Sequence, residues 1–113
     1  MARILYKPIP DLIFGTPDIG GGLFIEHGFS TIISAKSIGE NCWINQQVTI
    51  GYTNGQDSPI IGNNVRIGAG AIVIGNVYVG DDAVVGAGTV VTHDVPAKAT
   101  IVGNKPLQIY KKQ

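Results

Sequence analysis

The apolar positions of this chain recur every six residues over most of its length. Over residues 61–96 the repeat is uninterrupted: each block opens with Ile or Val, and a second small or branched apolar residue follows four places later. An amphipathic helix repeats about every 3.6 residues and a half-buried strand every two, so neither explains this spacing. A period of six is typical of a parallel β-helix, in which each block supplies one short strand and one turn.

The same period continues upstream with two interruptions. The upstream blocks open at Ile19, Ile25, Thr31, Ile38, Ile44 and Ile50, and eleven of the twelve opening positions in the chain are Ile or Val, with Thr31 as the exception. We interpret Ser37 as a one-residue insertion and residues 56–60 as a loop that leaves the repeat. Three blocks close one triangular coil, so the sequence predicts about four coils, each rising about 4.8 Å.

The two ends of the chain lack the period. Three prolines within residues 1–18 predict an extended, irregular N-terminal lead-in. Residues 97–113 form a C-terminal tail, which we expect to cover the open end of the coils because bare strand edges promote aggregation. The predicted organisation is an all-β chain with a lead-in over residues 1–18, a repeat domain over 19–96 and a tail over 97–113.

Composition narrows the function classes. The chain has 113 residues and a formal net charge of zero, which removes the electrostatic argument for nucleic acid or an anionic membrane as a partner. No apolar run approaches membrane-spanning length and the first residues do not resemble a secretion signal, so we expect a cytoplasmic protein. The single cysteine, Cys42, excludes an internal disulfide and is expected to be buried.

Several blocks resemble the hexapeptide-repeat acyltransferases and, among them, the serine acetyltransferase type. The matching segments are I-G-G-G-L-F-I-E-H-G from Ile19, I-N-Q-Q-V-T-I-G from Ile44, I-G-A-G-A from Ile67 and V-G-A-G-T-V-V from Val85. The E-H-G segment, two coils before I-G-A-G-A, is the most specific of them. The resemblance covers about residues 18–106. It implies a left-handed parallel β-helix, a homotrimer of parallel prisms, and acetyl-CoA bound as co-substrate between two subunits without a metal.

His27 is the residue that the resemblance assigns to catalysis. A hydroxyl is a poor nucleophile at neutral pH, and an imidazole can accept its proton as the oxygen attacks a thioester carbonyl. The acetyl group would then pass directly to the acceptor, without an acyl-enzyme. The resulting oxyanion needs a donor, for which the family match points to the backbone N–H of Gly51. In the family an aspartate orients the base; Leu12 stands at that position here, so Asp11, one residue away, is the candidate.

The resemblance also assigns contacts to the two substrates. Ala69 and Ala87, each in a G-A-G corner, would let the pantetheine arm of the coenzyme approach the backbone. Gly51, Thr53, Thr92 and His93 complete the predicted coenzyme contacts, with the last two near the adenine end. Glu26 would contact the acceptor, and a solvated corner charge is the alternative interpretation of this residue.

The predicted loop departs from the serine enzymes. They carry an Arg-His-Pro sequence that helps to bind the carboxylate of the amino acid, whereas this chain has Asp57, Ser58 and Pro59. An aspartate would repel a carboxylate, so the loop favours a neutral hydroxyl, such as one on a saccharide, with Asp57 as a substrate contact. From the sequence, the acceptor therefore stays open between serine and a saccharide.

An acetyl-CoA-dependent O-acetyltransferase is the leading prediction, and two other classes share the fold. A γ-class carbonic anhydrase needs three histidines per metal, and this chain has only His27 and His93, far apart in sequence. A non-catalytic structural prism, in which His27 is incidental, is the other alternative.

Overall fold

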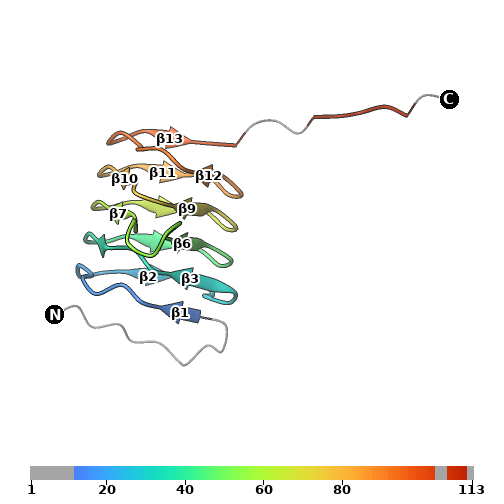
Figure 1. The fold of residues 1–113 in the computed structure, drawn as a ribbon. Helices are drawn as coiled ribbons and strands as arrows, with labels where there is room; N and C mark the ends of the chain where they lie inside the picture. Colours follow the sequence, from blue (N-terminus) through green and yellow to red (C-terminus); the bar gives the residue numbers. More distant parts are fainter. Residues whose placement is uncertain (1–11, 104–106, 112–113) are drawn as a thin grey trace.

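The computed structural model of this chain describes residues 12–103 and 107–111. Within these residues there are thirteen short strands and no helix. The strands stack into three parallel sheets that form the walls of a prism (Figure 1). This is the all-β parallel β-helix that the repeat predicts, and it is consistent with the left-handed type.

The three sheets are named A, B and C. Sheet A contains β1 (Leu12–Phe14), β3 (Thr31–Ile33), β6 (Thr49–Gly51), β9 (Ile72–Ile74) and β12 (Val90–Val91). Sheet B contains β4 (Ser37–Ile38), β7 (Ile60–Ile61) and β10 (Tyr78–Val79), extended by bridges from Ile19 to Ile38 and from Val79 to Val95. Sheet C contains β2 (Phe24–Ile25), β5 (Trp43–Ile44), β8 (Arg66–Ile67), β11 (Val84–Val85) and β13 (Thr100–Ile101).

The core consists of the columns that the repeat predicts. The opening residues of the blocks stack upon one another, and in the middle coils Ile44, Ile50, Ile67 and Val73 are fully buried. Each coil covers the apolar face of its neighbours, which is why a single block could not fold alone. Cys42 is 1% exposed, as expected, and its burial raises the pKa of its thiol.

Each sheet has five layers, so the helix has about five coils and not four. The additional strands come from segments assigned to the irregular ends: β1 of the lead-in pairs with β3, and β13 of the tail pairs with β11. Beyond this strand, Leu107, Ile109 and Tyr110 are each 85% exposed. These described residues of the tail therefore do not cover the end of the prism (Figure 1).

The register of four residues differs from the sequence interpretation. Ile33, not Thr31, stacks on Ile50 as the opening residue of its block. Val95 bridges Val79, so it opens a new block instead of lying inside the last one. Ile60 belongs to β7 and not to the loop, which therefore spans residues 52–59. Backbone hydrogen bonds between coils fix this register, and spacing along the chain does not reveal them.

Three edges join the sheets, and they are named by the sheets that they connect. The B–C edge leads from sheet B to sheet C, the C–A edge from C to A, and the A–B edge from A to B. The residues that the structure describes include no helix that could span a lipid bilayer.

Candidate active site

His27 lies in an expanded corner of the C–A edge. Before this corner Ile25 pairs with Ile44, nineteen positions further on, and after it Ile33 pairs with Ile50, only seventeen positions further on. The corner therefore contains two more residues than the corresponding corner of the next coil. The side chain of His27 is 62% exposed, as expected for a residue that projects from the stack.

Backbone hydrogen bonds identify the additional residues as His27 and its successor. Gln47 N–H donates to Phe29 O at 3.1 Å, and one coil further on Gly70 N–H donates to Gln46 O at 3.1 Å. Phe29 thus occupies the place in the stack that Gln46 occupies in the next coil, and His27 has no counterpart there. The insertion assigned to Ser37 is consequently wrong: a two-residue insertion at His27 is followed by a block that is one residue short, between Ile33 and Ile38.

The backbone at His27 is unusual. Gly28 N–H donates to Glu26 O at 2.8 Å, which makes His27 the centre of a three-residue turn with a φ of 65°. Positive φ is uncommon outside glycine, and three-residue turns of this hand are rare and strained. Strained turns of this kind are found at functional sites, so the backbone adds an observation that supports His27 as a catalytic candidate.

A carboxylate lies beside His27. Glu26 Oε1 is 3.8 Å from His27 Nε2, and Glu26 Oε2 accepts a hydrogen bond from the Trp43 indole N–H at 3.1 Å. The Trp43 ring is itself held between the Arg66 guanidinium, 4.6 Å from the ring centre, and the edge-to-face ring of Phe24. The outer face of sheet C therefore anchors the acidic group that lies nearest to the candidate base.

The two predicted alanines lie on the same edge as His27. Gly88 N–H donates to Ala69 O at 2.9 Å, so the G-A-G corners are stacked directly upon each other. Ala69 is half-buried and Ala87 is exposed, and both leave the backbone of the edge uncovered. Two coils separate the His27 corner from Ala69, which is about 10 Å along the prism.

Gln46 is a candidate that the sequence analysis missed. It lies on the C–A edge between the His27 corner and Ala69, and within the described residues its side-chain oxygen is buried without a hydrogen-bond partner. Buried polar atoms without a partner are rare, so this oxygen distinguishes Gln46 from most of the other described residues of the edge. The sequence signal that could have identified Gln46 is its polar side chain, because two later blocks have alanine at the same block position.

The loop over residues 52–59 lies on the A–B edge and is organised by Asp57. Asp57 Oδ1 accepts the backbone N–H groups of Thr53 at 2.7 Å and Asn54 at 3.1 Å, and Oδ2 is hydrogen-bonded to the Thr53 hydroxyl. The hydrogen bond from Thr53 holds the pKa of Asp57 below its ordinary value. Thr53, predicted as a coenzyme contact, and Asp57, predicted as a substrate contact, therefore first stabilise the loop itself.

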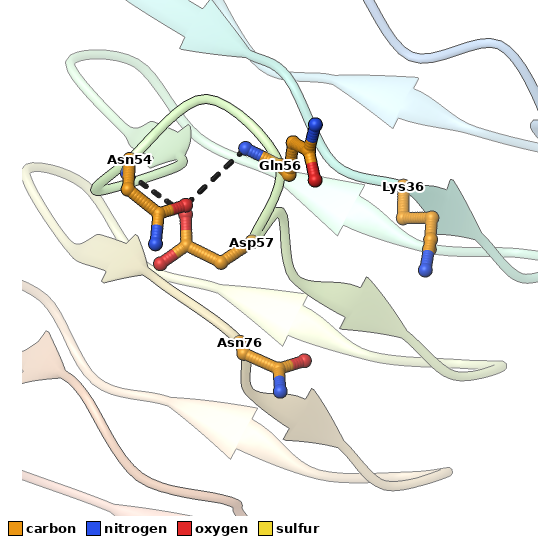
Figure 2. A pocket seen from close by; sticks show the side chains of 5 residues that line it. All are labelled: Lys36, Asn54, Gln56, Asp57 and Asn76. Carbon is orange, nitrogen blue, oxygen red and sulfur yellow. Dashed lines mark hydrogen bonds between the residues drawn. The ribbon is translucent and has the colours of Figure 1, made fainter.

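The loop forms one wall of a pocket of about 500 Å³. Figure 2 shows the five side chains that line it: Lys36, Asn54, Gln56, Asp57 and Asn76. They come from three successive corners of the A–B edge. The sequence analysis did not single out Lys36, because only the stacking of coils brings it beside the loop.

The other predicted contacts also lie along the A–B edge. Gly51 ends β6, and its carbonyl accepts the N–H of Gly75 at 3.1 Å. Thr92 and His93 follow β12, with Thr92 Oγ1 3.1 Å from His93 Nδ1, and they line a cavity of about 180 Å³ beside Val90.

The predicted site residues thus form two groups, one on each side of sheet A. Glu26, His27, Ala69 and Ala87 lie on the C–A edge, whereas Gly51, Thr53, Asp57, Thr92 and His93 lie on the A–B edge. Asp11 lies outside the described residues. Among the residues that are described, no three His, Cys, Asp or Glu side chains gather as a metal site.

An apolar column crosses the outer face of sheet A between these two groups. The outward residues Ile13, Ile32, Thr49, Ile72 and Val90 are paired one upon the other. Ile13 and Val90 are 61% and 60% exposed. Contiguous apolar surface of this kind commonly marks an interface.

Comparisons with known proteins agree with the fold. The model of the bacterial transferase hexapeptide family (six repeats) matches residues 58–93. A serine acetyltransferase of Synechococcus elongatus is 43% identical over 97 residues, which cover 82% of this chain and 40% of the relative. One of Helicobacter pylori is 44% identical over 97 residues, which cover 82% of this chain and 57% of the relative.

Solved structures give the same result. The serine acetyltransferase isoform 3 of Entamoeba histolytica in complex with cysteine matches with a TM-score of 0.74 and 35% identity, over 84% of this chain and 36% of that one. The enzyme of Neisseria gonorrhoeae in complex with serine matches with a TM-score of 0.71 and 38% identity, over 81% of this chain and 42% of that one.

The predicted resemblance is confirmed: residues 58–93 carry the hexapeptide repeat of bacterial transferases. The chain is also similar to serine acetyltransferases over most of its length. This chain spans 40% and 57% of the length of the two curated relatives.

Proposed function

We propose that this chain carries the transfer centre of an acetyl-CoA-dependent O-acetyltransferase that acts on a small hydroxyl acceptor. The observation that carries the proposal is the strained, exposed His27 turn, which interrupts an otherwise regular edge in a chain similar to serine acetyltransferases. The acceptor is serine or a saccharide hydroxyl, and the relatives favour serine.

His27 acts as the general base in this proposal. Its imidazole accepts the proton of the acceptor hydroxyl as the oxygen attacks the thioester carbonyl, and the coenzyme leaves as the free thiol, without an acyl-enzyme. The Glu26 carboxylate, held by Trp43, lies 3.8 Å from His27 Nε2 and can help to position the ring. Asp11 stays a candidate for the orienting role. The N–H of Gly51 is the proposed donor to the oxyanion.

Two copies of the chain are needed to assemble this centre. His27 and Gly51 lie on opposite sides of sheet A within one chain, so the C–A edge of one copy would meet the A–B edge of another. The apolar column on sheet A gives such copies a surface to bury. We therefore propose a homotrimer with parallel prisms.

The coenzyme would lie along the seam between copies. The short side chains of Ala69 and Ala87 leave room for the pantetheine arm, and Gln46 lies on the same edge below them. Thr92 and His93 would lie nearer the adenine. Because acetyl-CoA is the proposed co-substrate, we expect the reaction to take place in the cytoplasm.

The test is acetyl transfer from acetyl-CoA to L-serine by the purified chain, followed through release of free thiol. His27→Asn removes the base but keeps a residue that tolerates positive φ. We expect kcat/KM to fall about 10²- to 10⁴-fold, while circular dichroism, trimer mass and calorimetric binding of CoA stay unchanged. Asn41→Asp is the matched control, because it also keeps a residue that tolerates positive φ, at a position with a φ of 56° on the B–C edge.

Unchanged turnover in His27→Asn would remove His27 from the mechanism. A wild-type chain that binds no CoA and releases no thiol with any hydroxyl acceptor would favour the non-catalytic prism instead. Stoichiometric zinc or iron in the purified protein would favour a metalloenzyme.

A further inference from the structure

The pocket beside the loop on the A–B edge, here called the A–B pocket, contains a positively charged side chain that the loop itself lacks. Residues 52–59 include no Lys or Arg, but Lys36, from the preceding coil, lines the same pocket as Asp57 (Figure 2). The backbone N–H of Lys36 donates to Pro59 O at 2.7 Å, and Pro59 is buried. The end of the loop therefore fixes the backbone from which the Lys36 side chain projects.

The charge of Lys36 is available for a ligand. Within the described residues the one ion pair within 4 Å joins His27 and Glu26, so no described carboxylate neutralises Lys36. The oxygens of Asp57 already accept three hydrogen bonds from Thr53 and Asn54. A carboxylate has about four acceptor sites, so Asp57 can accept one more donor while its charge stays in the pocket.

Lys36 and His27 flank the same strand. The His27 corner precedes β3 (Thr31–Ile33) and Lys36 follows it, so the two side chains lie at the same height along the prism. A rotation axis parallel to the prisms preserves that height. This step rests on the parallel trimer of the proposed function. In that trimer, Lys36 of one copy lies at the same height as His27 of the neighbouring copy.

We propose that Lys36 is the specificity-determining residue of the acceptor site and binds the carboxylate of the acceptor. Asp57 then faces the ammonium group, and the amides of Asn54, Gln56 and Asn76 provide donors and acceptors around both charges. A pocket with one cation, one anion and three amides is complementary to a zwitterionic hydroxy amino acid. The preference for a neutral saccharide, which followed from the loop alone, is reversed once Lys36 is included.

The experiment compares L-serine with L-serinamide, which lacks the carboxylate, in wild-type protein and in Lys36→Met and Lys36→Arg. Loss of one charge-assisted hydrogen bond weakens binding about 10- to 100-fold. We expect Lys36→Met to raise the KM for L-serine by that factor with little change in kcat, and to leave the KM for L-serinamide and for acetyl-CoA unchanged. Lys36→Arg should restore most of the affinity for L-serine, and Lys98→Met, on the B–C edge, should behave as wild type.

Three results would overturn the proposal. The first is a KM for L-serine within twofold of wild type in Lys36→Met. The second is a raised KM for acetyl-CoA, which would assign Lys36 to a coenzyme phosphate. The third is faster transfer to glucose than to L-serine by the wild-type chain. If one of these three results occurs while His27→Asn loses all thiol release, the proposal for Lys36 fails but the proposed acetyltransferase function stands. The failure of one proposal can therefore be told from the failure of the other.

Discussion

The B–C edge and the A–B edge of the prism differ in how constant their length is from coil to coil. Along the B–C edge every coil takes six residues from one opening position to the next, as from Ile38 to Ile44 and from Ile61 to Ile67. The A–B edge takes five residues from Ile33 to Ile38 but eleven from Ile50 to Ile61. One edge is a constant structural turn, and the other is a variable edge that carries a loop and a pocket.

The turns of the B–C edge explain its constancy. The fourth residue of each turn has a positive φ: Gly22, Asn41, Asn64, Asp82 and Lys98. Side chains also bond across coils, since Asn63 Oδ1 accepts the Glu40 N–H and Asp81 Oδ1 accepts the Asn63 N–H, both at 2.8 Å. An additional residue would break these bonds in two coils at once. The polar candidate site residues are therefore found at corners whose number of residues can vary, as at His27 and at the loop.

The largest effect is expected from a methyl group placed inside the constant edge. A Cβ at Gly39 would lie 2.6 Å from the carbonyl carbon and oxygen of Gly62, so Gly39→Ala should lower the free energy of unfolding by about 3 kcal/mol. At Gly55, in the loop, a Cβ meets no atom within 4 Å and only the φ of 91° opposes it. Gly55→Ala should cost about 1 kcal/mol. Urea unfolding of both variants measures the difference, and equal losses would contradict the distinction between the edges.

Removal of the loop should separate stability from function. Deletion of residues 54–58 leaves six positions between Ile50 and Ile61, the same as between Val73 and Val79. Because loop length changes stability only slightly, we expect a thermal midpoint within a few degrees of wild type. Transfer to L-serine should fall more than about 100-fold, since the pocket beside Lys36 loses a wall. The same five residues inserted after Asn64 provide the control, and we expect that insertion to destabilise the fold.

The smallest effect is expected from the titration of Asp57. Its pKa is lowered in the folded chain by the Thr53 hydrogen bond, so its contribution to loop order is present above the ordinary pKa of about 3.9 and is lost as the pH falls through the folded value. The amide signals of Thr53 and Asn54, followed by NMR between pH 6 and pH 2, should shift together at this transition. Asp57→Asn should abolish the transition, and a transition that survives this substitution would assign it to another group.

Much of the fold could be predicted because the signal is local. The branched apolar residue that opens each block faces the interior, and its neighbours along the sequence indicate the corners. The register of the irregular coils could not be predicted: the sequence contains one net additional residue between Ile25 and Ile38, which was assigned to Ser37. In the structure, the corner at His27 has two residues more than a regular block, and the block after Ile33 has one residue fewer.

For the candidate site, residue types could be selected from sequence but their grouping could not. His27, Ala69 and Ala87 were predicted to lie at corners, and the stack places them on one edge. Lys36 and Gln46 gave almost no signal, because a lysine or a glutamine at a corner is ordinary until the neighbouring coil is in place. Their proposed roles depend on contacts between residues about twenty positions apart.

The sequence by itself determined the period of six, the composition of the core columns and the resemblance to hexapeptide-repeat acyltransferases, because inward side chains are selected one block at a time. Only the tertiary structure decided the number of coils, the bulge that projects His27, and the meeting of Lys36 with the loop. The physical reason is that hydrogen bonds between coils set the register and bring distant corners together, and these bonds leave no local pattern in the chain.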